Sequence, residues 1–464
     1  MRALLAFLTL LAATLPATAA NAVLTARQQQ SREIYRQLVE INTAPEGDTL
    51  AAAQAMAAHL MAAGMPAADV QVLQSAPRRG NLVARLRGNG RQRPLLLLAH
   101  LDVVEARRED WSTDPFKLVE KDGYFHGRGT QDDKYMAASF VSNLIRYQRE
   151  GYRPDRDLIL VLSTDEENGD EHQLGIRWLL ANHRALIDAE LALNEGATVG
   201  VRNGKAIWNA VQTSEKRYQD FWLEVRNRGG HSAQPRADNA IYALSLALGK
   251  LASYQFPLEL NATTRLYFER MAGFEKPEIA ADMRSLLQAL PDSAAVARLS
   301  AIPAYNALMR TTCVATRVDG GHADNALPQL ARALLNCRIL PGHSVDEVQQ
   351  TLSGAIGNAE IRIVPAAADT ASDPSPLDPQ LMTAITDLSK KFWPGTVVVP
   401  VMGAGATDSR FLRNAGIRAY GHSGLAADID DVRTHGRDER VSVQAFHTGQ
   451  EYLYQLVKLL AGGR

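Results

Sequence analysis

Short apolar runs alternate with helical stretches over the first two hundred residues, and this alternation limits the folds open to the chain. Four runs have the length of buried strands: 81–86, 94–104, 157–163 and 189–194. Helical spacing appears at 26–40, 49–63, 134–147 and 174–182. Strands that alternate with helices form a largely parallel sheet with helices on both faces. We therefore predict an α/β domain built around such a sheet.

Acidic residues and a histidine stand where three of these runs end. In chain order they are His100 and Asp102, then Asp165, Glu166 and Glu167, then Glu195. A further pair, Asp132 and Asp133, lies in a glycine-containing loop that runs into a helix. Each motif alone fits a hydrogen-bonded pair, an exposed turn or a solvated face. Since ligands gather at the carboxyl ends of parallel strands, and clustered carboxylates repel one another unless cations neutralise them, the combination indicates a metal site.

Two-metal hydrolysis explains why these residue types occur together. Two cations that share a carboxylate and a bridging water, ~3.5–4 Å apart, lower the pKa of the water and polarise a carbonyl. Zinc accepts both imidazole nitrogen and carboxylate oxygen. The strand period of two places His100 and Asp102 on one face, so Asp102 can hold the imidazole in one tautomer. Glu166 and Glu167 point different ways along a strand, so one can bind metal while the other moves protons.

Five motifs in order resemble the co-catalytic dizinc exopeptidase and deacylase family, which includes aminoacylase, carnosinase-type dipeptidases, glutamate-releasing carboxypeptidase and succinyl-diaminopimelate desuccinylase. The motifs are His100-x-Asp102, Gly127-Arg128-Gly129-x-x-Asp132-Asp133-Lys134, Asp165-Glu166-Glu167-x-Gly169, Asn194-Glu195-Gly196 and His435-Gly436-x-x-Glu439. The resemblance covers essentially the whole mature chain. Tyr135 departs from it, since many members have glycine there, and this departure concerns the packing beside the metal site.

The resemblance implies two zinc ions per chain, for which cobalt or manganese can substitute. One zinc is expected on His100, Asp132 and Glu195, and the other on Asp132, Glu167 and His435. Glu166 is the implied general acid and base, and the Asp132–Asp133 peptide is expected to be cis. Glutamate at position 195, in place of aspartate, is closer to the aminoacylase, desuccinylase and carboxypeptidase branches than to the carnosinase branch.

The middle of the chain changes to a pattern typical of an α+β domain. Strands are expected at 218–226, 311–318, 331–340 and 360–365, with helices at 239–251 and 345–356. We predict a signal peptide at 1–20, a catalytic domain in two parts at 21–212 and 367–464, and an inserted lid or dimerisation domain at 213–366. Residues 262–299 form an extra helical excursion, since Gly273, Pro277 and Pro291 interrupt helical spacing.

The resemblance also implies substrate contacts outside the metal ligands. His231, which follows Gly229 and Gly230, matches a histidine that stabilises the tetrahedral oxyanion, often across a dimer interface. Asn325 and Arg338 match substrate-binding residues, and a guanidinium can hold a carboxylate through two hydrogen bonds. The glycine-rich loop around Gly405 matches a loop that offers N–H groups to a carboxylate. Without the resemblance, a turn residue, a surface ion pair and a flexible loop are the alternatives.

The amino terminus and the composition address location and partners. Arg2 precedes an apolar run, Ala3–Leu15, and small residues up to Ala20, an order typical of a secretory signal, so we expect a periplasmic or secreted protein. Fifty basic and fifty-one acidic residues leave no excess field for nucleic acid or an anionic membrane. Cys313 and Cys337 either bridge neighbouring strands or are two small buried hydrophobes, and we favour the bridge.

These observations together predict a metal-dependent hydrolase of amide bonds in small peptides or N-acyl amino acids, most simply a carboxypeptidase or dipeptidase. An N-acyl amino acid amidase, or a synthase that runs this reaction in reverse, would share every motif. An inactive binding module of the same fold is a further alternative, but such modules usually lose ligands or the acid and base residue. Arg338 and the Gly405 loop favour substrates with a free α-carboxylate, and a homodimer through the lid domain is a further expectation.

Overall fold

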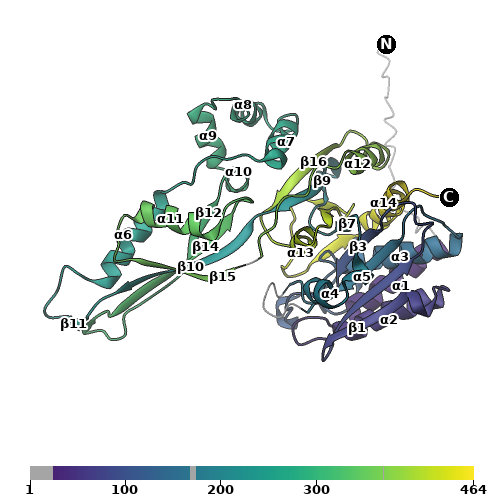
Figure 1. Ribbon diagram of the computed structural model, residues 1–464, viewed down its shortest axis with the longest axis horizontal. Helices are drawn as coiled ribbons and strands as arrows, with labels where there is room; N and C mark the ends of the chain where they lie inside the picture. Colours follow the sequence, from purple (N-terminus) through teal and green to yellow (C-terminus); the bar gives the residue numbers. More distant parts are fainter. Residues whose placement is uncertain (1–23, 168–173, 369) are drawn as a thin grey trace, which may run out of the picture.

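The computed structural model describes residues 24–167, 174–368 and 370–464 and has two lobes (Figure 1). The predicted signal peptide at 1–20 and Gly169 of the third motif lie outside these residues. One lobe is an α/β domain formed by the two ends of the chain, and the other is an elongated inserted domain. Within the described ranges, no helix combines the length and apolarity that crossing a membrane requires.

A ten-stranded sheet forms the centre of the α/β domain, in the order β1-β2-β6-β3-β7-β17-β9-β8-β18, with β16 paired to β9. The strands are β1 (Val70–Ala76), β2 (Arg79–Leu86), β3 (Leu95–His100), β6 (Leu158–Ser163), β7 (Leu191–Asn194), β8 (Val199–Arg202), β9 (Lys205–Glu215), β16 (Val397–Gly403), β17 (Arg418–Gly421) and β18 (Ala426–Asp428). Its central strands β6, β3, β7 and β17 run parallel, which confirms the predicted fold class. Every residue of β3 and β6 is buried.

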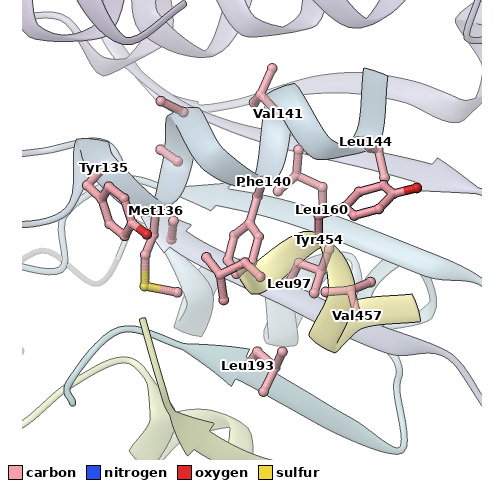
Figure 2. Packing of buried hydrophobic residues seen from close by; sticks show 14 of the residues in the cluster. Leu97, Tyr135, Met136, Phe140, Val141, Leu144, Leu160, Leu193, Tyr454 and Val457 are labelled. Atoms are coloured by element: carbon pink, nitrogen blue, oxygen red, sulfur yellow. The ribbon is translucent and has the colours of Figure 1, made fainter. Parts of the chain in front are cut away.

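Helices cover both faces of this sheet. One face carries α1 (Ala26–Glu40), α2 (Thr49–Ala62), α3 (Lys134–Glu150), α12 (Pro379–Phe392) and α14 (Val443–Ala461). Figure 2 shows Phe140 and Leu144 of α3 packed with Leu97, Leu160 and residues of α14. The other face carries α4 (Ile176–Asn182), α5 (Arg184–Ile187) and α13 (Ser409–Asn414). The continuous apolar strands predicted from the sequence are thus buried on two sides.

A small three-stranded sheet lies beside the main one. It consists of β4 (Val119–Lys121), β5 (Tyr124–His126) and β19 (Arg440–Ser442), in the order β19-β5-β4. Arg440 of β19 pairs with His126 of β5. This pairing brings the segment just after β5 next to the segment just before β19, although they are far apart in sequence.

The inserted domain contains a four-stranded antiparallel sheet in the order β12-β14-β10-β15. Its strands are β10 (Arg217–Arg226), β12 (Thr312–Gly320), β14 (Leu330–Ile339) and β15 (Arg362–Ala368), and α6 (Ala240–Ser253) and α11 (Val345–Ile356) pack on one face. Cys313 and Cys337 face each other across β12 and β14 and form a disulfide, which confirms the predicted bridge. The domain boundaries expected at 212 and 366 stay predictions.

The helical excursion extends further than expected and lies between the two lobes. It comprises α7 (Ala262–Met271), α8 (Pro277–Leu286), α9 (Ser293–Ser300) and α10 (Pro303–Met309). Its apolar core includes Phe268 and Met283 and packs against Val399 of β16. The buried Lys216, between β9 and β10, donates hydrogen bonds of 2.8 Å to the carbonyls of Ala307 and Arg310. The excursion therefore contacts both lobes where the chain passes from one to the other.

Tyr135, the departure from the family pattern, is fully buried between α3 and α14. Its ring meets Phe446 edge to face, with centroids 6.0 Å apart. Its hydroxyl occupies the space that a Cβ on Gly449 would need, and the Gly424 carbonyl would lie 2.7 Å from that Cβ. The bulk of Tyr135 is accommodated by Gly449 on the opposing helix α14.

This arrangement predicts a packing conflict in the Gly449→Ala variant. Overpacking of this kind costs about 2 kcal/mol of unfolding free energy, to be measured by urea denaturation. Tyr135→Phe should restore part of that loss in the double variant, because it removes the hydroxyl. Gly354→Ala, in α11 with no atom within 4 Å of the added Cβ, is the matched control and should be neutral or stabilising. Equal effects of the two alanine variants would contradict this account.

Candidate active site

The predicted metal ligands meet at the carboxyl edge of the parallel strands. His100 is the last residue of β3, and Glu195 directly follows β7. Asp132 lies two residues before α3, and its peptide bond to Asp133 is cis, which confirms the expected isomer. His435 comes from the loop that precedes β19. Strand ends and two loops thus deliver these side chains to one place.

Asp132 lies between two histidines. Its Oδ1 is 2.9 Å from Nε2 of His100, and its Oδ2 is 3.1 Å from Nε2 of His435. Nε2 of His435 also lies 3.0 Å from Oε1 of Glu167. His100, Asp132 and Glu167 each offer one ligand atom, and these atoms lie within 4.8 Å of one another. One carboxylate that faces a different imidazole with each oxygen fits a ligand shared by two metal ions.

Negative charge is concentrated around this carboxylate. Burial raises the pKa of Glu166 well above its usual value, and Glu195 adds to the effect. Burial, followed by the charge of Asp132, raises the pKa of Glu195 in the same way. Hydrogen bonds to Asp132 and Glu167 raise the pKa of His435 to about 10. Because so many carboxylates share a buried site, divalent cations would stabilise it, and the donor set of imidazoles and carboxylates fits zinc.

The two adjacent glutamates lie in the turn after β6, not on the strand. β6 ends at Ser163, and Asp165 has a positive φ of 70°. Glu167 contacts His435, whereas the larger charge effects on Glu166 come from His100, Glu195 and Asp408, and that of Glu167 is smaller. The pair therefore splits between two parts of the site, as expected, although a turn and not the strand alternation separates the side chains.

Asp102 supports the site through a different atom from the one expected. Since β3 ends at His100, Asp102 lies beyond the strand, and its backbone carbonyl accepts a 2.9 Å hydrogen bond from Nδ1 of His100. Its Oδ1 is 3.8 Å from that nitrogen. The carboxylate instead accepts the Glu167 N–H through Oδ2, at 2.9 Å. The Nδ1 contact still leaves Nε2 of His100 free for a metal.

The glycine-rich loop after β16 is fixed beside the strand ends. Asp408 accepts a 2.9 Å hydrogen bond from the Ser163 hydroxyl, and Asn194 donates to the Ser409 hydroxyl at 3.0 Å. Arg338 of β14 reaches across from the inserted domain and donates to the Ala404 carbonyl at 3.3 Å. The structure thus brings Arg338 and the Gly405 loop together, as the substrate-binding prediction requires.

His231 and Asn325 lie elsewhere. They belong to a pair of short strands, β11 (Gly230–His231) and β13 (Ala326–Leu327), and to the turn beside it, where the Ser232 N–H bonds to the Asn325 carbonyl at 3.0 Å. This pair is at the far end of the inserted domain, remote from β3 and β7 (Figure 1). The structure does not bring these two residues to the metal ligands of the same chain.

Three buried residues beside the site received no role from the sequence. Arg128 and Glu439 form an ion pair, 2.6 Å long, between side chains that are 3% and 0% exposed. Asp408 is also buried, and burial raises its pKa to about 6. Arg128 and Glu439 belong to the second and fifth motifs, and this membership was the sequence feature that could have pointed to a role for them. A buried charge so close to metal ligands is a candidate for a functional contact.

Residues 96–459 match the family model described as peptidase family M20/M25/M40. The chain belongs to this family. It is 30% identical over 377 residues, 79% of this chain and 72% of the relative, to the N-fatty-acyl-amino acid synthase/hydrolase PM20D1 of Xenopus tropicalis. It is 28% identical over 382 residues, 79% of this chain and 71% of the relative, to the probable carboxypeptidase S-like 2 of Dictyostelium discoideum.

Solved structures of the family share the fold. The M20 family metallo-carboxypeptidase Sso-CP2 of Sulfolobus solfataricus superposes with a TM-score of 0.69 at 16% identity, covering 93% of this chain and 99% of that one. Family membership makes the chain a metal-dependent hydrolase of amide bonds, as the motifs predicted. The inserted α+β domain is likewise part of the shared fold.

Proposed function

We propose that this protein is a dizinc carboxypeptidase or dipeptidase with the ligand sets expected from the sequence. The observation that carries the proposal is the position of Asp132, whose two oxygens face His100 and His435. His100, Asp132 and Glu195 would hold one zinc, and Asp132, Glu167 and His435 the other. When bound, the ions polarise the scissile carbonyl and lower the pKa of the attacking water.

Glu166 is the proposed proton carrier. Its carboxyl group is close to the ligand cluster, and burial raises its pKa. In its ionised form it accepts a proton from the attacking water, the raised pKa helps it to hold that proton, and it then delivers the proton to the nitrogen of the leaving amine. The Nδ1–H of His100 donates a hydrogen bond to the Asp102 carbonyl, so His100 takes no part in this proton transfer.

Glu166→Gln should separate chemistry from metal binding. The variant should retain about two zinc ions per chain, measured by elemental analysis, while kcat falls by about 10²- to 10⁴-fold. A chelator should abolish wild-type activity, and added zinc should restore it. Glu167→Gln is the matched control and should lose metal, because Glu167 contacts His435. Metal loss in Glu166→Gln with full retention in Glu167→Gln would mean that the roles are exchanged.

The substrate is proposed to carry a free α-carboxylate on the C-terminal side of the bond that is cut. Arg338 contacts the Gly405 loop through the Ala404 carbonyl, so its guanidinium and the N–H groups that we expect this loop to offer would meet a pair of anionic oxygens together. Peptides cut by carboxypeptidases and N-acyl amino acids share this group next to the amide. The Dictyostelium and Sulfolobus relatives favour the first class, and the Xenopus relative makes N-acyl amino acid hydrolysis the second candidate function.

Amidating the α-carboxylate of a good substrate should lower kcat/KM by roughly 30-fold, equivalent to about 2 kcal/mol for a lost charge-assisted contact. The assay compares matched peptides and N-acyl amino acids, each as free acid and as amide. Arg338→Lys should reduce the preference, because an ammonium cannot reproduce the planar fork of a guanidinium. Equal kcat/KM for acid and amide would argue instead for an aminopeptidase or an amidase of other substrates.

A homodimer through the inserted domain would explain the remote position of His231 and Asn325. Strand β12 is at the edge of its sheet and exposes Val314 (60%) and Val318 (66%). Helix α6 exposes Tyr242 (63%) and Leu246 (71%). An edge strand and a neighbouring helix with exposed apolar side chains are typical of a subunit interface. We propose that each subunit supplies His231 and Asn325 to the site of its partner.

Mixing two inactive variants tests this arrangement. Glu166→Gln and His231→Ala chains, unfolded and refolded together, should recover about a quarter of wild-type activity, since half the dimers then contain one intact site. Light scattering gives the mass, and Leu246→Glu should shift the protein toward monomer. A wild-type monomer, or mixed dimers without recovered activity, would overturn the shared site.

Export to the periplasm or the exterior stays a prediction from the first twenty residues. The disulfide between Cys313 and Cys337 supports it, because such bonds persist in oxidising compartments.

A further inference from the structure

The proposed ligands differ in how the fold supports them. His100 and Glu195 sit at the ends of β3 and β7, within the main sheet. Asp132 and His435 lie in loops, one after β5 and one before β19. Because β5 and β19 pair with each other, the two loops leave the small sheet side by side. The distance between Asp132 and His435 therefore depends on what joins these loops.

Glu439 holds the loop that carries Asp132. Its Oε1 accepts the backbone N–H groups of Gln131, at 2.6 Å, and Asp132, at 3.1 Å. Its Oε2 accepts the N–H of Gly129 at 3.2 Å. A fully buried carboxylate that accepts three backbone N–H groups fixes the backbone around the bridging ligand.

Arg128 holds the loop that carries His435. Its Nη1 pairs with Glu439, and its Nη2 donates to the carbonyls of His435, at 3.3 Å, and Gly436, at 3.0 Å. The guanidinium lies 5.1 Å from the ring centroid of Trp111, which covers it. His435 has a φ of 61° and a side chain that is 51% exposed, so the hydrogen bonds to its backbone add to the contacts of its ring in fixing its position.

We propose that the Arg128–Glu439 ion pair sets the separation of Asp132 and His435 and so determines the affinity for the second metal ion. Both are positioning residues, since they contact ligand backbones and not the reacting atoms. The inference rests on the proposed ligand assignment. The first metal depends on the pair less, because its other two ligands have supports of their own. His100 is held through its Nδ1 contact with the Asp102 carbonyl. Glu195 follows Asn194, whose carbonyl accepts the His422 N–H at 2.7 Å.

Isothermal titration calorimetry, in which zinc is added to the metal-free protein, tests the proposal. Wild type should show two binding steps, and the step lost in His435→Ala identifies the second metal. Glu439→Gln, which keeps the side-chain size but removes the charge, should weaken that step by about 10- to 100-fold. It should weaken the first-metal step less, because Asp132 is the one ligand of that metal whose backbone Glu439 holds. Arg128→Lys should weaken it less, because the ammonium keeps the charge but cannot reach all the groups that Arg128 contacts.

A second carboxylate with the same kinds of partner provides the control. Asp157 accepts from Arg85 at 2.7 Å and from the Gly88 N–H at 2.7 Å, at the opposite end of β6 from the ligands. Asp157→Asn should lower the Tm of the metal-free protein while both zinc steps stay unchanged.

Four results would overturn the inference or its basis. The inference would be wrong if the zinc affinity of the second step were unchanged in both Glu439→Gln and Arg128→Lys. It would also be wrong if both steps were weakened equally. If Asp157→Asn lowered the zinc affinity of the second step as much as Glu439→Gln does, the effect would be a general loss of stability instead. If Glu439→Gln fails to fold, Arg128→Lys decides alone. A wild-type protein without two steps would overturn the proposed metal centre itself, which distinguishes the two failures.

Discussion

The carboxylate of Asp132, shared between His100 and His435, is the contact on which the rest of the site depends. For its two oxygens to face two imidazoles, a loop before α3 and a loop before β19 must approach the end of β3 together. The apolar strands β3 and β6 supply the rigid background for this meeting, because every one of their residues is buried. Small displacements of either loop would separate the donors.

Charge explains why the site is built so tightly. Glu166, Glu195 and Asp132 lie where burial penalises each ionised carboxylate, and the raised pKa values of the two glutamates express this cost. The raised pKa of His435 is the opposite side of the same effect, since an imidazolium neutralises part of the cluster. Divalent cations would neutralise the carboxylates more completely. The need to neutralise this cluster is therefore the physical link between this edge of the sheet and metal-dependent amide hydrolysis.

The inserted domain reaches the edge of the main sheet where the predicted metal ligands meet. Arg338 reaches the glycine-rich loop of the catalytic domain, while β11 and β13 extend to the far end of the inserted domain. The helices α7 to α10 pack on β16, and Lys216 is hydrogen-bonded to the end of α10. The crossing between the lobes is therefore embedded in packed structure.

The sequence by itself determined the parallel sheet and the strand-end positions of His100 and Glu195, because buried strands and the polar residues that follow them are local patterns. Resemblance added His435 and the cis peptide. The sequence did not show that β3 ends at His100, because a strand ends where its pairing ends, and pairing is not visible in composition. This end is what allows the Asp102 carbonyl, and not its carboxylate, to hold His100. Tyr135 opposite Gly449, and Arg128 paired with Glu439 across 311 residues, were decided only by tertiary structure, because such contacts depend on how distant elements pack.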